Sequence, residues 1–335
     1  MTAHLNLRQP VCQLTANDQP LNALITSRII NVSVTDNRAS EADELAITLD
    51  DHDGALELPK RGVILTCRLG WSDGTFDMGR FSVDETEWAG TPDTITIKAR
   101  SADFKSPLKT GKRKSYHQQT FGQVAKAIAG EHALTLVMVD ALQGIDLGHI
   151  DQTDESDLNL LTRLAHDNGA ELSIKQGRLL IFAAGQAQTA SGKTLPAVTL
   201  TRRDGDQFRY SEADRDSDHT AVAANWHDPK AAKQQKAKAG VAEGKDAKVK
   251  QLKGTYATEA AAQRAAAAEL SRIKRQQATF SMTTAYGRPD ISSESPVRLQ
   301  GFKPQIDRLN WIVAKATHSY SSSGLTSSLE LEANV

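Results

Sequence analysis

The stretch VILTCRLGW at residues 63–71 alternates apolar and polar side chains, the period of two that is typical of a half-buried β-strand. A similar run, VRLQGF, occurs near the C-terminus at residues 297–302. The next apolar run begins ten residues after Trp71, at Phe81, and nine residues after Phe302, at Trp311. The two parts of the chain therefore share the spacing of their strands as well as the type of strand.

The similarity extends to both sides of these runs. Phe81 is followed fourteen residues later by Ile95, and Trp311 is followed at the same interval by Leu325. Earlier alternating runs also have counterparts, residues 45–49 with 280–284 and residues 31–34 with 220–223. We therefore predict a mainly β fold with two similar small antiparallel β-barrels, one in residues 1–100 and one in residues 186–335.

The repeat also predicts which side chains occupy equivalent places. Phe81 should correspond to Trp311 and Val83 to Val313, because both pairs share the same alternation and the same interval to the following strand. Trp71 should lie near the position of Phe302.

Composition and charge exclude several classes of protein. The 40 Lys and Arg residues nearly balance the 41 Asp and Glu residues, so no net field attracts DNA or an acidic membrane. Cys12 and Cys67 are isolated thiols, which fits a reduced compartment better than a disulfide framework. The first residues lack the pattern of a signal peptide, and no apolar run approaches the length of a membrane span. These features predict a soluble protein made in the cytoplasm.

Residues 101–185 have a different character and predict a compact α+β module. Thr120 is a suitable N-cap for a helix through His132, and an apolar strand at residues 134–139 follows. A second helix after Gln152, capped by Thr153 or Asp154, would bury Leu158, Leu161 and Leu164. Residues 170–175 and 178–183 then read as a hairpin that turns at Gln176-Gly177.

The second β unit is predicted to be interrupted at residues 229–277. The stretch from Lys230 to Lys253 holds eight Lys residues and few large apolar side chains. Such a composition favours a mobile, solvated segment that is dispensable for the fold. The Ala-rich stretch that follows, Thr258 to Gln276, predicts a helix.

Several short motifs suggest chemistry, but each has a simpler interpretation. Ser191-Gly192-Lys193-Thr194 resembles the end of a P-loop, yet it lacks the upstream Gly and the helix that must follow. Asp50-Asp51-His52-Asp53 lacks the ligand alternation of a calcium loop. Glu85 and Glu87 lie on one strand, whereas glycoside hydrolysis uses two carboxyl groups across a cleft. We therefore predict no catalytic, cofactor-binding or metal-binding residues and no cofactor.

Several strings of residues, in order along nearly the whole chain, carry a specific resemblance. They are Thr35-Asp36-Asn37-Arg38 followed by Glu41-Ala42-Asp43, Arg100-Ser101-Ala102-Asp103-Phe104, His149-Ile150-Asp151-Gln152 with Glu155-Ser156-Asp157 and Leu161-Thr162-Arg163-Leu164-Ala165, and Ser323-Gly324-Leu325-Thr326-Ser327-Ser328-Leu329-Glu330-Leu331. With these motifs the sequence resembles the late control D family, the baseplate hub proteins of contractile-tailed phages. It is also similar to the hub part of VgrG and to the hubs of R-type tailocins.

This resemblance implies a structural protein rather than an enzyme. Members form a homotrimeric adaptor between a hexameric tail tube and a trimeric spike, with two tube-like β-barrels in each chain. The chain ends at Val335, directly after the last expected strand, so the spike is expected to be a separate protein. The resemblance further implies contacts with other baseplate proteins, assembly in the host cytoplasm and a final place in the virion. It implies no membrane contact in the mature hub, and it makes nucleic-acid binding an unlikely role.

Two other functions stay open from the residues alone. A hydrolase of cell-wall polymer at the tail tip would need paired carboxylates in a cleft. A nucleic-acid-binding late regulator would use the Lys-rich stretch, which lacks aromatic residues for base stacking.

Overall fold

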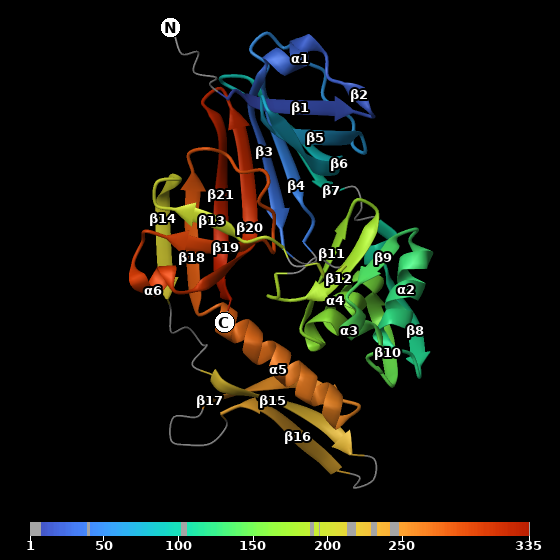
Figure 1. The fold of residues 1–335 in the computed structure, drawn as a ribbon. Helices are drawn as coiled ribbons and strands as arrows, with labels where there is room; N and C mark the ends of the chain where they lie inside the picture. Colours follow the sequence, from blue (N-terminus) through green and yellow to red (C-terminus); the bar gives the residue numbers. More distant parts are fainter. Residues whose placement is uncertain are drawn as a thin grey trace.

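The computed structural model describes residues 8–38, 41–101, 106–187, 191–193, 195–212, 219–228, 233–241 and 248–334. Most of the ordered elements are strands, as expected for a mainly β fold. Figure 1 shows a long sheet that runs through the upper half of the molecule, an α+β module beside it, and a small sheet covered by one long helix below. No helix in the described ranges combines the length and apolar character needed to cross a bilayer.

The first strand unit is an antiparallel sheet built around a dense apolar core. In spatial order its strands are β3 (Ile29–Asn37), β4 (Glu44–Asp50), β7 (Thr94–Ser101), β6 (Gly74–Ala89), β5 (Ile64–Trp71) and β1 (Pro10–Ala16). The short strand β2 (Gln19–Pro20) and helix α1 (Ala23–Ser27) follow β1 in the chain. Alternate residues of these strands, such as Leu45, Ile47 and Phe81, are buried on one face. The alternation of apolar and polar residues in the sequence therefore reflects burial of one face of the sheet, as expected.

The second strand unit repeats this order. Its strands are β14 (Gly205–Glu212), β18 (Ala278–Thr284), β21 (Gly324–Asn334), β20 (Asn310–Ser321), β19 (Pro296–Gln300) and β13 (Val198–Thr201). Helix α6 (Pro304–Asp307) connects β19 to β20. The repeat differs at its last strand, because β13 runs parallel to β19 whereas β1 runs antiparallel to β5. Trp311 and Phe280 lie at the centre of this core.

The registers of the two units agree residue by residue. Val83 lies opposite Ala99 just before a bulge in β6, and Val313 lies opposite Leu331 just before a bulge in β20. Two residues earlier, Phe81 faces Leu65 and Trp311 faces Val297. The predicted equivalence of Phe81 with Trp311 and of Val83 with Val313 is therefore confirmed.

Trp71 and Phe302 are less closely matched. Trp71 ends β5, whereas Phe302 lies two residues beyond the end of β19. Their rings also have different neighbours: Trp71 stacks on Tyr286 with 3.9 Å between ring centroids, and Phe302 packs edge-on against Phe280.

The two units form one continuous sheet. Strand β20 pairs with β3 from Lys315 opposite Asn37 to Ser321 opposite Asn31. This ladder joins the units in a 13-stranded sheet. The prediction of two separate closed barrels is not confirmed, because each unit continues into the other.

The counterpart of β3 differs from the predicted one. Residues 220–223 lie in β15 (His219–Asp228), which pairs with β16 (Lys233–Gly240) and β17 (Lys248–Tyr256) in a separate three-stranded sheet. The place equivalent to β3 belongs to β14. Strand β14 escaped notice because its sequence, GDQFRYSE, lies at a sheet edge and shows little apolar alternation.

The prediction of a mobile Lys-rich segment is wrong for its described residues. Residues 233–240 and 248–253 lie in strands, while 230–232 and 242–247 lie outside the described residues. In β16 the small residues Ala237 and Ala239 alternate with lysines and are buried, together with Val222, against helix α5 (Glu259–Arg275). The apolar surface that the segment lacks is supplied by this Ala-rich helix, which begins at the N-cap Thr258 as expected.

The α+β module contains more strands than the sequence indicated. Its elements are the 3₁₀ helix η1 (Ser106–Lys109), β8 (Gly111–His117), α2 (Phe121–Glu131), β9 (Thr135–Met138), α3 (Asp140–Gln143), β10 (His149–Ser156), α4 (Asp157–Asp167), β11 (Ala170–Lys175) and β12 (Arg178–Ala183). Strand β8 was not predicted because its sequence, GKRKSYH, is strongly basic. The predicted helix from Thr120 is confirmed, with a complete capping box formed by Thr120 and Gln123.

The hairpin β11–β12 turns at Gln176-Gly177 as predicted, and both residues have the positive φ that a tight hairpin turn requires. The start of α4 differs from the prediction. Ser156, rather than Thr153 or Asp154, caps this helix, because β10 continues to Ser156 in its pairing with β8. Leu158, Leu161 and Leu164 are buried as expected.

Candidate functional site at a charged junction

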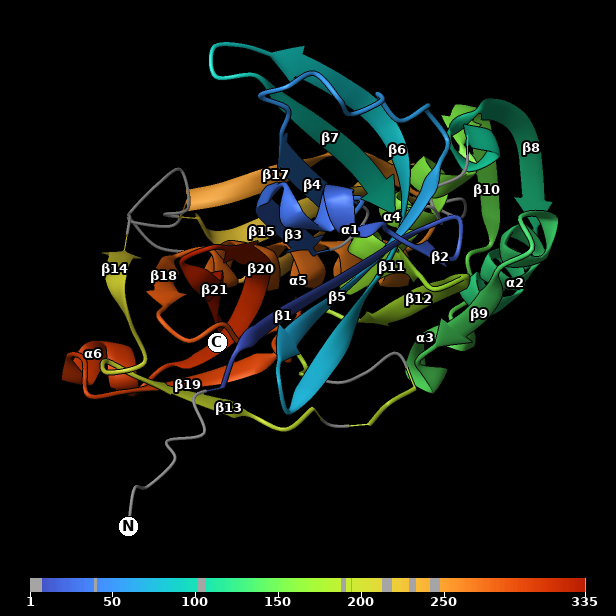
Figure 2. The ribbon, with the colours of Figure 1, turned by 90° about the horizontal axis from the view of Figure 1, so that it is seen from above.

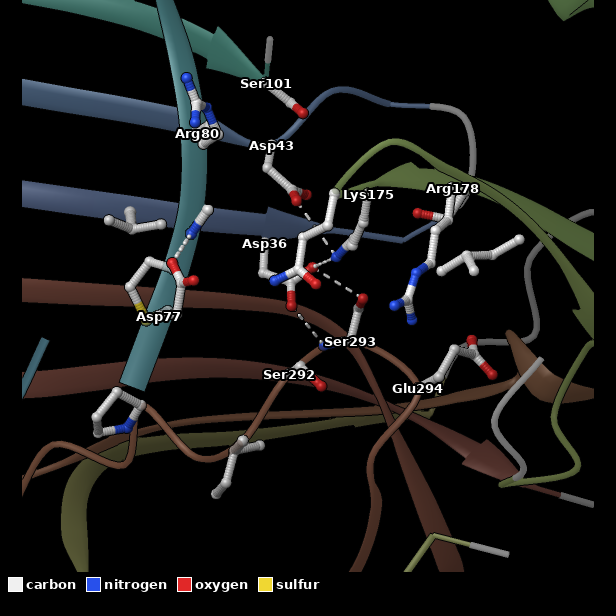
Figure 3. Close-up of a pocket in the computed structure, with 18 of the residues that line it drawn as sticks. Asp36, Asp43, Asp77, Arg80, Ser101, Lys175, Arg178, Ser292, Ser293 and Glu294 are labelled. Atoms are coloured by element: carbon white, nitrogen blue, oxygen red, sulfur yellow. Dashed lines mark hydrogen bonds and ion pairs between the residues drawn. The ribbon is translucent and has the colours of Figure 1, made fainter. Parts of the chain in front are cut away.

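A cluster of charged side chains lies where the two strand units meet the module (Figure 3). Asp36 comes from the end of β3, Asp43 from the turn before β4, and Lys175 from the end of β11. The Lys175 ammonium forms an ion pair with Asp36 and lies 3.3 Å from Asp43 Oδ2. Ser293, from the loop before β19, donates its backbone N–H and its hydroxyl to Asp36 over 3.1 and 2.9 Å. The Asp36 carboxylate therefore joins the first strand unit, to which it belongs, to the module through Lys175 and to the second strand unit through Ser293.

Burial controls the ionisation of this cluster. It raises the pKa of Asp43 to about 6, against the opposing effect of Lys175 and with a further contribution from Asp36. Burial also disfavours the charged form of Lys175, but the two carboxylates prevail and raise the pKa of that ammonium. The lysine therefore stays charged, and Asp43 binds its proton more tightly than an ordinary aspartate does.

A cavity of about 540 Å³ adjoins this cluster. Besides Asp36, Asp43 and Lys175, Arg80 from β6 and Arg178 from β12 line its walls. Figure 3 shows these side chains converging from different elements. The cavity lies between the strand units and the module. At its edge the ion pairs of Lys175 with Asp36 and Asp43 connect the module to the first strand unit.

A second charged group lies beside the first and centres on Arg38. Its guanidinium forms an ion pair with Glu294 and a second one with Glu332, 2.6 Å away in β21. Burial raises the pKa of Glu294, and burial together with the nearby Arg38 lowers the pKa of Arg275 at the end of α5. Asp36, near the end of β3, and Arg38, just after it, are therefore the centres of two neighbouring clusters of ion pairs.

The chemistry of the junction is that of a structural joint. A carboxyl group with a raised pKa beside a cavity is a common feature of active sites. Here, however, the polar atoms are directed at one another: Asp43 Oδ1 accepts the Asn37 backbone N–H at 3.1 Å, and the Ser293 hydroxyl donates to Asp36. Such a network holds segments that are far apart in the sequence in a fixed relation.

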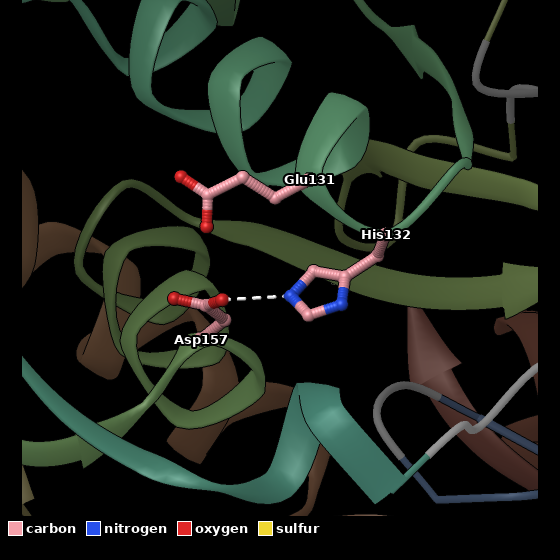
Figure 4. A group of neighbouring side chains, drawn as sticks. All are labelled: Glu131, His132 and Asp157. Carbon is pink, nitrogen blue, oxygen red and sulfur yellow. Dashed lines mark hydrogen bonds and ion pairs between the residues drawn. The ribbon is translucent and has the colours of Figure 1, made fainter.

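A third group, Glu131, His132 and Asp157, has the composition of a metal site (Figure 4). His132 Nε2 lies 2.7 Å from Asp157 Oδ2, at the N-terminus of α4. The Lys112 ammonium lies 2.6 Å from both Asp157 Oδ2 and Glu131 Oε2, and therefore already places a positive charge between the carboxylates. Burial of Asp157 is outweighed by hydrogen bonds from His132, Lys112 and Gln152, which lower its pKa. This arrangement fits an ion pair that ties α2 and β8 to α4.

The motifs singled out in the sequence lie in ordinary surroundings. Ser191 to Lys193 precede strand β13 rather than a helix, and Thr194 lies outside the described residues. Asp53 receives two hydrogen bonds from Arg28, at 2.5 and 2.6 Å. Glu85 pairs with Lys98 at 3.0 Å on the surface of the sheet. Ser191 lines the cavity beside the junction, whereas Asp53 and Glu85 pair with partners elsewhere on the molecule.

Sequence reasoning did not identify the junction as a site. Asp36, Arg38 and Asp43 were noted only as parts of the strings Thr35-Asp36-Asn37-Arg38 and Glu41-Ala42-Asp43. Ser101 of a further string lines the cavity, while Ala102, Asp103 and Phe104 lie outside the described residues. The available signal was the pair of opposite charges, Asp36 and Arg38, at the end of a strand that alternates apolar and polar residues. Their partners, Lys175 and Glu294, are too distant in sequence to be inferred.

Replacing Asp43 with Asn should remove one contribution by which the protein loses stability as the pH rises. Because the pKa of Asp43 in the folded protein, about 6, exceeds the ordinary value of about 4, the folded state binds the proton more tightly than the unfolded state. Stability conferred by protonated Asp43 is therefore largely present at pH 4 and is lost as the pH rises through about 6. We expect Asp43→Asn to gain roughly 1–3 kcal/mol relative to the parent between pH 4 and pH 7.

Urea unfolding at several pH values measures this difference, and Glu44→Gln, an exposed carboxyl on the adjoining strand, is the control. A variant that lost stability relative to the parent over the same interval would show that Lys175 dominates and that the pKa of Asp43 is lowered.

The fold and this junction define a class of protein: a β-sheet scaffold whose buried chemistry serves to join segments. The tail protein of Neisseria meningitidis MC58 has the same fold, with a TM-score of 0.72 at 14% identity over 97% of this chain and 96% of that one. The sequence profile described as phage tail baseplate hub (GPD) matches residues 71–324. A probable baseplate hub protein of Escherichia phage 186 is 42% identical, over 96% of this chain and 92% of that protein. The chain belongs to the phage tail baseplate hub family.

The resemblance found in the sequence is thereby confirmed. The fold also matches a chain of the Francisella PdpA–VgrG complex, with a TM-score of 0.55 at 11% identity over 98% of this chain and 59% of that one. The protein is a baseplate hub protein of phage tails, and its place is in the baseplate of the mature tail. The comparisons do not support a cell-wall hydrolase or a nucleic-acid-binding regulator.

Proposed function

We propose that three copies of this chain form a ring that connects a six-fold tail tube to a three-fold spike. The observation that carries this proposal is the repeated order of six strands in the two units. Three chains with two similar units each provide six nearly equivalent surfaces, which is what contact with a hexameric tube requires. In this assembly each unit acts as a tube-like barrel segment.

The parts of the chain then have separate tasks. We assign residues 1–100 and 186–335 to the two tube-like units and residues 101–185 to a module that contacts other baseplate proteins. Figure 1 supports this division, because the module projects to one side of the strand units. We further propose that a trimeric spike is a partner of the hub, and that the hub assembles in the host cytoplasm before it enters the virion.

We propose a mechanical rather than an enzymatic role. The charged junction supports it, because Asp36, Lys175 and Ser293 fix the module to both strand units. A joint of this kind transmits force between segments without needing substrate access.

Native mass spectrometry of the hub co-expressed with its spike protein tests the trimer. The expected result is a species containing three copies of the 36.3 kDa chain. A dimer, or a chain that stays monomeric with the spike present, would contradict the proposal. Class averages from negative-stain microscopy should show a ring with a six-fold outline.

A further inference from the structure

Two histidines of the α+β module face one another on a small sheet at the surface. Strands β8 and β10 form this two-stranded sheet, and Figures 1 and 2 show them side by side at an edge of the module, away from the strand units. His117 is the last residue of β8, and His149 is the first residue of β10. The two residues lie directly opposite each other in the antiparallel ladder, although 32 positions separate them in the sequence. The fold therefore brings them together.

The two imidazole rings approach each other through one nitrogen atom each. The Nδ1 atoms of His117 and His149 are 2.9 Å apart. The ring centroids are 4.5 Å apart, so the rings come closest at these nitrogen atoms rather than at their centres. A neutral imidazole has one protonated and one unprotonated nitrogen, and the unprotonated nitrogen can bind a metal ion. Two such nitrogens at this distance form a chelating pair.

Asp151 determines which nitrogen of His149 carries the proton. It follows His149 by two residues on the same face of β10, and its Oδ2 lies 3.0 Å from His149 Nε2. The Ser115 hydroxyl donates a hydrogen bond of 2.6 Å to Asp151 Oδ1 and thereby lowers the pKa of this carboxyl group. The charged carboxylate holds the proton on Nε2 and leaves Nδ1 of His149 free to bind an ion. A carboxylate behind a metal-bound histidine is the usual arrangement in protein metal sites.

We propose that His117 and His149 bind a divalent transition-metal ion such as Cu²⁺ or Ni²⁺ through their Nδ1 atoms, at the end of the β8–β10 sheet. With metal–nitrogen bonds of about 2.0–2.1 Å, two donors 2.9 Å apart subtend an angle of about 90° at the ion. Adjacent corners of a square plane have this angle, and Cu²⁺ and Ni²⁺ adopt that geometry with nitrogen ligands, whereas tetrahedral Zn²⁺ needs donors further apart. The His149 side chain is 51% exposed, so water can fill the remaining positions.

The surrounding charges favour this pair over the group of side chains in Figure 4. In that group the Lys112 ammonium already lies between the two carboxylates. Among the described residues, no lysine or arginine forms an ion pair with Asp151, which contacts His149 and Ser115 instead. A cation can therefore reach His117 and His149 without displacing a fixed positive charge. It would join the end of β8 to the start of β10.

Titration of the full chain with Cu²⁺, followed by calorimetry and by electron paramagnetic resonance, tests the site. Every sample carries His4→Ala, because a histidine close to the N-terminus can bind Cu²⁺ together with backbone nitrogens. We expect one Cu²⁺ per chain and a spectrum split by two imidazole nitrogens. Asp151→Ala should weaken binding by about 10–100-fold while both nitrogens remain in the spectrum. His117→Ala and His149→Ala should each weaken it at least as much and remove one nitrogen.

His52→Ala is the matched control. His52 is exposed and its Nδ1 lies 3.0 Å from Asp50 Oδ2, but no second histidine faces it in the described part of the chain, so this variant should bind Cu²⁺ as the parent does. In the presence of EDTA all these variants should melt with the parent, because the replaced side chains are exposed. A parent that fails to bind one Cu²⁺ per chain would overturn the proposal, and so would a His117→Ala variant that binds the ion as tightly as the parent.

Discussion

Replacing Trp311 with alanine is expected to lower the free energy of unfolding by about 3–5 kcal/mol. The indole is completely buried in the second strand unit, where it contacts the rings of Phe280 and Tyr210. Its Nε1–H donates a hydrogen bond of 3.1 Å to the carbonyl of Ile306, and the variant would lose this hydrogen bond. Urea unfolding followed by far-UV circular dichroism measures the loss.

Trp88→Ala is the matched control, because it removes the same side chain from β6, the equivalent strand of the first unit. Trp88 is 55% exposed in the single chain, so its loss should cost less than about 1 kcal/mol. If Trp311→Ala cost no more than Trp88→Ala, the interior of the second unit would be loosely packed and the equivalence with Phe81 would lose its physical basis.

The duplication was predictable from the sequence because its signal is local and repeated. Phe81 and Val83 alternate with polar residues in the same way as Trp311 and Val313, and the interval to the next strand is conserved within the chain. Short antiparallel strands joined by short turns preserve such intervals. The structure then extended the match to the bulge that follows each valine.

The small sheet of β15, β16 and β17 was not predictable by the same route. Its strands use alanine as the buried residue, as at Ala237 and Ala239, and lysine as the exposed one. Alanine gives a weak alternation signal, and the high charge of the segment suggested a lack of structure. The apolar surface that covers this sheet comes from α5, and β15 pairs in parallel with β17. Both contacts are between separate segments of the chain, so the alternation within one segment does not indicate them.

The charged junction escaped prediction because its contacts connect distant positions. Asp36 binds Lys175 and Ser293, which follow it by 139 and 257 residues. A carboxylate at a strand end usually lies in solvent, and only the approach of the module and of the loop before β19 buries this one. Residue identity therefore shows which groups are charged, and the tertiary structure decides which of them meet.

Replacing Leu161 with aspartate is expected to unfold the α+β module. Leu161 is completely buried in α4, which packs on β11, and the core around it includes Leu172 and Ile128. The variant loses the burial of a leucine and places a carboxyl group without a partner in an apolar core. Together these effects should cost more than about 4 kcal/mol. Thermal melting of the full chain measures the loss of stability, and limited proteolysis shows whether residues 106–183 become open to cleavage.

Asn159→Asp supplies the control for charge alone on the same helix. Residue 159 is exposed in the first turn of α4, where a negative charge interacts favourably with the helix dipole, so this variant should melt at or slightly above the parent temperature. The charged junction provides a second measurement, the pH dependence of stability. Lys175 lies at the end of β11, so unfolding of the module removes the partner of Asp36 and Asp43. The Asp43-dependent change of stability with pH should then disappear in Leu161→Asp. If Leu161→Asp instead melted with the parent and kept that pH dependence, α4 would have to present a different face to the module core.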